Sequence, residues 1–483
     1  MSLQKESLLV ALIILCFLGL NLLTASRSPT VWLDEVSYSD PAVNLATGKG
    51  FVSSAWYGQS KEELWAGNVP LHALLLAGWL KCFDFGIVQV RSLNYFLIAL
   101  AAIAFWWAFI KGKLFRHAST RIGCVLLLLN GYGMSFCYRS GRPDCIVILL
   151  FSLMFLGCSL PSRRNRYLLL GLSCFLLPAA GLQGLPLLVA CATFWLILKR
   201  TSGIGEFLVA AIGSSIGLIA LLGIYWHLGV LDAFIHSTLA QTSANNSQGE
   251  VVTAVHKWAS RAAEVFADHS LVALWVGLFA VSIHLALRAG WHQIKMPRNL
   301  LLFCIGVATL MLLAGKFPVY YAWMAFVPAV LAWGILFDKS LTSQETGLLR
   351  WFLLALACLV ALSGLPLRLA LTIREWNARD YEPVKMLALN SITASDVVFT
   401  DVQGYYATKP LAKTTYSGSY SYVLAEKEKL EISVLLIDPV ELKRINELIG
   451  GGWSPVDGNS LLLEEGHSLG ARKYRLQLFR RLN

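Results

Sequence analysis

The chain has 483 residues, of which 56% are hydrophobic and only 14% are charged, and its mean hydropathy is +0.60. Soluble globular proteins carry about 25% charged residues, so this composition excludes a soluble enzyme and predicts a polytopic membrane protein. The net charge is +11, yet residues 372–483 hold 14 basic and 14 acidic residues. A basic excess confined to the apolar part fits the cytoplasmic loops of a membrane protein and argues against a nucleic-acid-binding surface.

The first apolar segment, residues 7–24, is expected to be an uncleaved membrane helix, because no clear small-residue cleavage site follows it. All ten cysteines lie in or beside apolar segments, and none occurs in a CxxC pair. This distribution is typical of small buried hydrophobic residues and not of a disulfide framework or a metal site.

An acidic stretch follows the first helix, within an expected outer loop over residues 25–68. Asp34, Glu35 and Asp40 fall within seven residues, among tryptophan and tyrosine. Ionisable side chains at a membrane surface are costly unless they are used, which makes this stretch a functional hypothesis. The alternative is a solvated loop whose acids cap a helix, with Asp34 at the N-cap and Glu35 in the first turn.

Segment length and loop charge together predict the membrane topology. Residues 70–83 are apolar but shorter than the ~20 residues needed to cross a bilayer. The loop at 111–121 contains four basic residues and no acid, so we expect it in the cytoplasm. Residues 70–83 are therefore predicted to form an in-plane or re-entrant helix. Residues 167–198 are too long for one crossing, and the interruption at 178–186 divides them into two helices.

This reasoning predicts eleven spans, with the N-terminus inside and the C-terminus outside. The five inside loops then hold thirteen basic and three acidic residues, as the positive-inside rule requires. The expected spans are residues 7–24, 87–110, 123–138, 145–160, 167–198 (two helices), 206–228, 271–287, 299–314, 319–337 and 348–371.

Residues 372–483 differ in kind from the membrane part, residues 1–371. Apolar runs at 396–400 and 432–437 and an alternating run at 472–479 predict strands. Residues 439–449, followed by three glycines, predict a helix. We expect a small α/β domain on the outer surface, and no phosphate-cradling glycine loop or nucleophile elbow occurs in its sequence.

The predicted topology brings three distant features to one face, namely Asp34 with Glu35, the stretch from Arg139 to Asp144, and Lys316. A carboxylate there can take the proton from an acceptor hydroxyl or amine, and cations can hold a phosphate leaving group. The alternatives are interfacial snorkelling for Lys316 and a helix cap for Asp144. The agreement of three separate segments favours transfer from an anionic lipid carrier.

The motifs around these residues resemble those of the GT-C glycosyltransferases, in the branch of the protein O-mannosyltransferases and the lipid A aminoarabinose transferase. The resemblance is specific over about 30–160, looser to 340 and uninformative beyond. The matching motifs are Trp32-Leu33-Asp34-Glu35, Tyr38 to Leu45 ending at Gly48-Lys49-Gly50-Phe51, Pro70-Leu71, Val90-Arg91-Ser92-Leu93, Arg142-Pro143-Asp144, and Lys316-Phe317-Pro318 with Tyr320-Tyr321 and Pro328.

The resemblance implies an all-α, GT-C-like bundle and an inverting enzyme that uses a polyprenyl-phosphate sugar. Asp34 would be the catalytic base, and Asp144 a second catalytic or positioning acid. Relatives often place an acid, lysine or histidine directly before the juxtamembrane proline, whereas this chain has Val69 there. The donor phosphate is therefore assigned to Lys316, Arg91 and Arg142. The other expected site residues are Glu35, Tyr38, Asp40, Asn68, His72, Arg139 and Tyr320.

The expected partners are a polyprenyl-phosphate-linked sugar, an acceptor that is a protein, glycan or lipid, and membrane lipids, with no nucleic acid. No cofactor is firmly implied; a divalent metal with Glu35 as its ligand stays open. The expected location is the inner (plasma) membrane, with the site facing outside or the periplasm. One alternative is a transporter or flippase of a lipid-linked sugar, which would need mid-bilayer ionisable sites. Another is a non-catalytic assembly protein, which would lack the acids at the surface.

Overall fold

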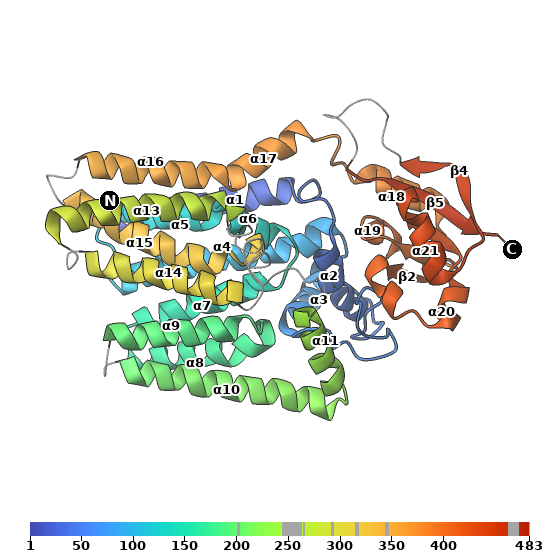
Figure 1. Ribbon diagram of the computed structural model, residues 1–483, viewed down its shortest axis with the longest axis horizontal. Coiled ribbons are helices and arrows are strands. Elements are labelled where there is room, and N and C mark those ends of the chain that lie inside the picture. Colours follow the sequence, from blue (N-terminus) through green and yellow to red (C-terminus); the bar gives the residue numbers. More distant parts are fainter. Residues whose placement is uncertain are drawn as a thin grey trace, which may run out of the picture.

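The computed structural model describes residues 1–199, 203–243, 263, 266–290, 294–313, 318–342, 347–461 and 473–482. Figure 1 shows a bundle of long helices along one axis and an α/β domain beyond one end of it. The N-terminus lies at the opposite end of the bundle from this domain.

The bundle consists of apolar helices, and the chain is a multi-pass membrane protein. Within the described residues, seven helices are long and apolar enough to cross a membrane, or eight if the bent α5–α6 pair is one span. The helices of the whole bundle, including those too short to cross a membrane by themselves, are α1 (Leu3–Leu23), α4 (Ile87–Lys111), α5 (Ala118–Asn130), α6 (Tyr132–Arg139), α7 (Asp144–Ser159), α8 (Arg163–Ala180), α9 (Gly184–Lys199), α10 (Ile204–His227), α13 (His269–Ala289), α14 (Lys295–Leu313), α15 (Trp323–Thr342), α16 (Gly347–Ser363) and α17 (Leu365–Arg374).

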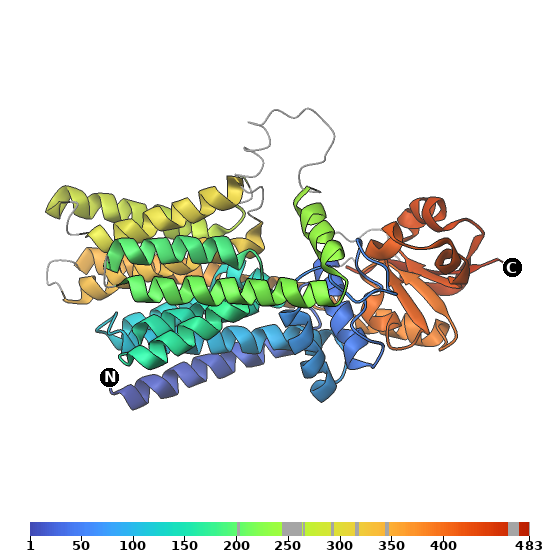
Figure 2. The same ribbon diagram turned by 90° about the horizontal axis from the view of Figure 1, so that it is seen from below.

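Each of the eleven expected spans has a helix in this bundle. The shorter or more polar ones, α7, α8 and α9, lie alongside the long helices (Figures 1 and 2). Residues 167–198 form two helices, as predicted, with a break between Ala180 and Gly184. The last expected span is two helices, because Gly364 separates α16 from α17. A Cβ atom at Gly364 would lie 1.6 Å from the Asn130 carbonyl oxygen, so only glycine permits this close approach.

Four short helices gather at the end of the bundle that faces the α/β domain. They are α2 (Leu33–Ala46), α3 (Leu71–Phe83), α11 (Leu231–Ser243) and the 3₁₀ helix η3 (Val319–Tyr321). The expected outer loop 25–68 thus contains a helix. Asp34 and Glu35 lie in its first turn, where acids are favoured by the helix dipole, but Trp32 and not Asp34 is the N-cap residue.

The C-terminal domain contains one five-stranded sheet with the order β2-β1-β3-β5-β4. β1 pairs in parallel with β2 and β3, and β5 is antiparallel to β3 and β4. The strands are β1 (Val397–Thr400), β2 (Thr414–Ser417), β3 (Val434–Ile437), β4 (Trp453–Leu461) and β5 (Leu476–Arg481), and the helices are α18 (Glu382–Ser391), α19 (Tyr405–Thr408), η4 (Gly418–Tyr422), α20 (Glu426–Glu431), η5 (Pro439–Glu441) and α21 (Leu442–Ile449).

All residues of β1 and β3 are buried, which explains why their apolar runs predicted strands. The helix expected at 439–449 is present as η5 and α21. The strand expected at 472–479 begins at Leu476, and Arg472 lies outside the described residues. The edge strands β2 and β4 were not predicted, because their sequences are rich in polar and turn-forming residues.

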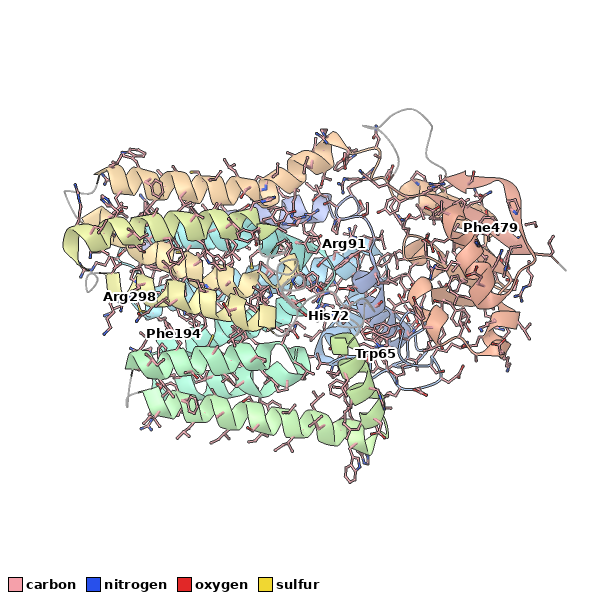
Figure 3. All side chains as sticks on the ribbon, in the orientation of Figure 1. Trp65, His72, Arg91, Phe194, Arg298 and Phe479 are labelled. Carbon is pink, nitrogen blue, oxygen red and sulfur yellow. The ribbon has the colours of Figure 1, made fainter. Side chains whose placement is uncertain are left out.

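The sidedness of the bundle can be tested by labelling. In Figure 3, His72 and Arg91 lie at the end that faces the C-terminal domain, and Arg298 lies at the other end. In intact cells that express variants without the native cysteines, we expect His117→Cys to be unreactive toward a membrane-impermeant maleimide and Lys385→Cys to react. Both positions are accessible in the structure, at 37% and 50% side-chain exposure, so a difference reports sidedness. Labelling at position 117 would contradict the eleven-span topology.

Candidate active site

The three acids of α2 lie in three different environments. Asp34 retains 30% of its side-chain exposure, whereas Glu35 and Asp40 are fully buried. Successive helical residues point about 100° apart, so neighbouring acids face different parts of the protein. Asp34 alone of the three is accessible to a substrate.

Asp34 belongs to a cluster that is organised around Arg142. Arg142 donates from Nη1 to Asp34, from Nε to Asp144 Oδ2 at 2.9 Å, and from Nη2 to the Tyr321 hydroxyl at 3.4 Å. Gln183 donates to the other oxygen of Asp144 at 3.1 Å. Burial by itself lowers the pKa of Arg142, but Asp144, the tyrosines and Asp34 raise it well above its usual value. Arg142 is therefore a permanent cation between two carboxylates.

Aromatic rings enclose the Arg142 guanidinium. Its central carbon lies 3.7 Å from the ring centroid of Tyr320, and it is also within 6 Å of the rings of Tyr38 and Tyr321. Asn68 donates to the Tyr38 hydroxyl at 3.1 Å. Burial raises the pKa of Tyr38, so its hydroxyl stays protonated at neutral pH. The ring faces, the cation and the Asp34 carboxylate thus form one polar and aromatic surface.

His72 is connected to this cluster through Asn94. Its Nε2 lies 3.3 Å from Asn94 Oδ1, and the Asn94 amide donates to the Arg142 carbonyl at 2.8 Å. His72 is only 2% exposed, and burial lowers its pKa to about 4. A neutral, buried imidazole at this position orients the backbone of Arg142 and does not offer a charge to a phosphate.

Glu35 and Arg91 form a buried pair away from the Asp34 cluster. Arg91 donates from Nε and Nη2 to the two carboxylate oxygens of Glu35, each at 2.6 Å, and both side chains are fully buried. Nη1 of Arg91 donates to the carbonyls of Ala25 and Pro29. A phosphate would have to displace Glu35 from this arginine. We therefore assign Arg91 a structural role, as a correction to the expected phosphate contact.

Gly141 is needed beside this pair. It has a φ of +66°, and a Cβ atom there would lie 2.7 Å from Cγ of Glu35. Both oxygens of Glu35 accept a hydrogen bond from Arg91. Within the residues that the structure describes, no group of three His, Cys, Asp or Glu side chains could hold a metal ion.

Arg139 also has a structural role. It is 1% exposed and donates to the Asn21 and Thr24 side chains and to the Ser28 carbonyl, at 2.6, 2.9 and 2.8 Å. These contacts join α6 to the C-terminal end of α1 and to the residues that follow it. Arg139 was expected in the site on sequence grounds and is instead buried beneath it.

Asp40 connects α2 to the C-terminal domain. Its Oδ1 accepts from Lys409 Nζ and the Tyr405 hydroxyl, each at 2.5 Å, and its Oδ2 accepts from the Ser53 hydroxyl and the Ser54 amide. Burial by itself raises the pKa of Asp40, but Lys409 and the other donors outweigh this and hold it below its usual value. Asp40 is therefore an interface residue and does not reach the Asp34 cluster.

The contact between the two parts of the chain extends well beyond Asp40. Ser54 donates from its hydroxyl to the Thr415 carbonyl at 2.7 Å and accepts from the Ser417 amide at 3.1 Å, so it pairs with the edge of β2. Arg27 forms an ion pair with Asp380 at 3.1 Å. The C-terminal domain is thus fastened to the same segment that carries Asp34.

The structure brings together Asp34, Asp144, Arg142, Tyr38, Asn68, His72 and Tyr320, whereas Glu35, Arg91, Arg139 and Asp40 serve packing or the domain interface. Lys316 lies outside the described residues. Gln183 and Asn94 were missed; Gln183 is the polar side chain in the interruption between two apolar helices, which is the signal that could have identified it. Lys409 gave no sequence signal.

Comparison with known proteins identifies the fold. No protein-family model and no curated protein matches the sequence. Among solved structures, apo ArnT from Cupriavidus metallidurans aligns with a TM-score of 0.61 at 12% identity, over 99% of this chain and 98% of that one. The same protein bound to undecaprenyl phosphate gives 0.57 at 13% identity, with the same coverage.

A second match is the archaeal oligosaccharyltransferase AglB from Archaeoglobus fulgidus, in complex with an inhibitory peptide and a dolichol-phosphate. Its TM-score is 0.51 at 12% identity, over 92% of this chain and 70% of that one. These proteins are GT-C glycosyltransferases. The similarity to ArnT extends over the helical bundle and the C-terminal domain together. The chain therefore has the GT-C fold.

Proposed function

We propose that this protein is an integral-membrane glycosyltransferase that transfers a sugar from a polyprenyl-phosphate carrier to an acceptor on the outer face of the membrane, with inversion at the anomeric carbon. The observation that carries this proposal is the Asp34–Arg142–Asp144 cluster at one end of a GT-C bundle, with Asp34 partly exposed. A partly accessible carboxylate next to a fixed cation suits a reaction in which a proton is removed while a phosphate leaves.

In the proposed reaction, the Asp34 carboxylate takes the proton from the acceptor hydroxyl or amine as that atom bonds to the anomeric carbon. The bond from this carbon to the phosphate oxygen breaks, and its electron pair leaves with the carrier phosphate. Arg142 compensates the charge that develops on the leaving phosphate. Attack on the face opposite the leaving group inverts the configuration.

Asp144 acts as a positioning acid in this proposal. It is fully buried, and its two oxygens accept from Arg142 and Gln183. A carboxylate without exposure does not reach an acceptor, but it fixes the orientation of Arg142. Tyr38 and Tyr320 flank the guanidinium and offer ring faces against which a sugar can pack.

The carrier and the location rest on similarity and charge. The solved structures of ArnT and AglB contain undecaprenyl phosphate and a dolichol-phosphate. Lys316 is proposed as a further cation for the donor phosphate on its motif alone. The positive-inside loops support a plasma-membrane protein whose site faces outward.

The proposal can be tested in a deletion strain of the source organism. We expect the lipid-linked sugar to accumulate and one envelope glycan, lipid or protein to lose a single sugar, as measured by mass spectrometry. Wild-type protein should restore the product. The purified protein should cleave the sugar–phosphate bond of the accumulated lipid when acceptor is added. Movement of the intact lipid across vesicles without cleavage would contradict the transferase and support a flippase.

A further inference from the structure

Arg368 in α17 is a half-buried cation without a carboxylate partner. Its Nε donates to the Ser135 hydroxyl at 2.8 Å, and its Nη2 donates to the Tyr132 carbonyl at 3.4 Å. Among the described residues, no carboxylate oxygen lies within 4.0 Å of it. Asp268 attracts it from a greater distance, but both Asp268 oxygens accept backbone amides, those of Leu271 and Gly133. Arg139 likewise has no carboxylate partner among the described residues, but it is only 1% exposed, whereas Arg368 remains partly accessible to a ligand.

A row of aromatic rings connects Arg368 to the Asp34 cluster. The Arg368 guanidinium carbon lies 4.1 Å from the ring centroid of Tyr132 and 5.1 Å from that of Phe136. Phe136 stacks on Tyr320 with 6.3 Å between centroids and 25° between planes. Tyr320 in turn contacts Arg142, whose guanidinium carbon lies 3.7 Å from the Tyr320 ring centroid. The two arginines therefore border one aromatic row, Phe136 and Tyr320.

The described charges of the site do not balance, so binding of a phosphate there requires a second cation. Arg142 contributes one positive charge, and Asp34 and Asp144 contribute two negative ones, so the described cluster is net negative. A carrier phosphate brings a further negative charge into a largely buried site, where like charges repel strongly. Arg142 alone cannot offset this repulsion, because its charge is already shared between two carboxylates.

We propose that Arg368 binds the phosphate of the polyprenyl carrier and supplies, together with the proposed Lys316, the positive charge that the described part of the Asp34 cluster lacks. The inference rests on the proposed function. An arginine suits this task because its planar fork can donate two parallel hydrogen bonds to phosphate oxygens. Nη1 of Arg368 has no hydrogen bond to the described residues and is available for such a contact.

The competing role for Arg368 is structural, since its contacts with Ser135 and Tyr132 join α17 to α6. The two roles differ in what Ser135→Ala does. If Arg368 only joins the helices, Ser135→Ala and Arg368→Gln should affect stability similarly, and neither should change phosphate binding. If Arg368 binds phosphate, only the loss of its charge should weaken binding.

The test measures binding of undecaprenyl phosphate to the purified full chain in detergent, by the lipid-induced increase in thermal unfolding temperature and by direct titration. We expect Arg368→Gln to raise the dissociation constant about ten- to a hundredfold, as the loss of a charge-assisted contact implies. The dissociation constant of Arg368→Lys should lie between those of wild type and Arg368→Gln. The matched control is Arg374→Gln in the same helix, 62% exposed, which should bind like wild type.

Unchanged binding by a folded Arg368→Gln variant, or weakening as large in Ser135→Ala, would overturn the inference while leaving the proposed function in place. A wild-type protein that binds undecaprenyl phosphate no better than phosphatidylglycerol would instead contradict the proposed function, and the inference with it. Inorganic phosphate should compete with the lipid in wild type and much less in Arg368→Gln. Competition that is equal in both proteins would also count against Arg368.

Discussion

Asp34→Asn is expected to lower the rate of sugar transfer about 10²–10⁴-fold, the usual cost of removing a general base. Asparagine keeps the size of the side chain and can still accept a hydrogen bond from Arg142, but it cannot take a proton from the acceptor. Binding of the carrier phosphate should be retained or become tighter, because Arg142 and Asp144 are unchanged and one negative charge near the phosphate is removed. Initial rates at saturating donor and acceptor, together with carrier titration, separate the two effects.

The matched control is Asp438→Asn. Asp438 is 27% exposed and paired with an arginine, much like Asp34 at 30%, but it lies within the C-terminal domain and outside the cluster. Glu35→Gln is a poor control, because it would leave the buried charge of Arg91 unpaired, at a cost of about 3–5 kcal/mol. Near-normal transfer by a folded Asp34→Asn variant would rule out the proposed base.

The meeting of the site residues could be predicted from the sequence because it depends on topology. Loop charges and segment lengths place the ends of particular helices on one face, and Asp34, Arg142 and Tyr320 all lie at such ends. No exact packing is needed for that inference. Figure 1 shows α3 beside α2 at the bundle end, and its expected in-plane or re-entrant placement stays a prediction.

The different environments of Asp34, Glu35 and Asp40 could not be predicted from the sequence. Asp34 and Glu35 are adjacent in sequence, yet one is exposed and the other is fully buried against Arg91. Their partners are set by how α2 packs on α3 and by its contacts with Arg91 of α4 and with the C-terminal domain, which no local pattern encodes. The same holds for Lys409, whose contact with Asp40 spans 369 residues of sequence.

The C-terminal domain shows a related limit. Strands that are buried on both faces, such as β1 and β3, have continuous apolar runs and could be recognised. Strand β2 reads Thr-Thr-Tyr-Ser, and it is buried because Ser54 and the segment around it cover its edge. A strand that is completed by a distant segment has no apolar run of its own to reveal it.

Lys409→Met is expected to weaken the attachment of the C-terminal domain to α2 and to reduce transfer, although Lys409 does not touch the Asp34 cluster. The substitution leaves the fully buried Asp40 carboxylate without its cation, which typically costs about 3–5 kcal/mol. Because Asp40 and Asp34 lie on one helix, loss of this contact should disturb the placement of Asp34. Thermal unfolding and transfer rates measure the two consequences.

The interaction between Asp40 and Lys409 can be measured by a double-mutant cycle. Asp40→Asn leaves Lys409 as the unpaired buried charge, so each single variant should be destabilised. Asp40→Asn/Lys409→Met removes both charges and should be more stable than either one. The control is Lys385→Met, since Lys385 forms an exposed pair with Glu382 and such pairs contribute about 0–1 kcal/mol. Additive effects at positions 40 and 409 would show that the two side chains are not coupled.

The loss of stability in Lys409→Met should depend on pH in a defined direction. In wild type, Lys409 holds the pKa of Asp40 below its usual value, so the contribution of the pair is present above that value and is lost only in acid. In Lys409→Met the effect of burial dominates, and we expect the pKa of Asp40 to rise above its usual value. The native variant then binds a proton more readily than the unfolded chain does, so its stability falls as pH increases. The deficit relative to wild type should therefore shrink when pH is lowered from 8 toward 5, and a deficit that grows over this range would contradict a buried, unpaired Asp40.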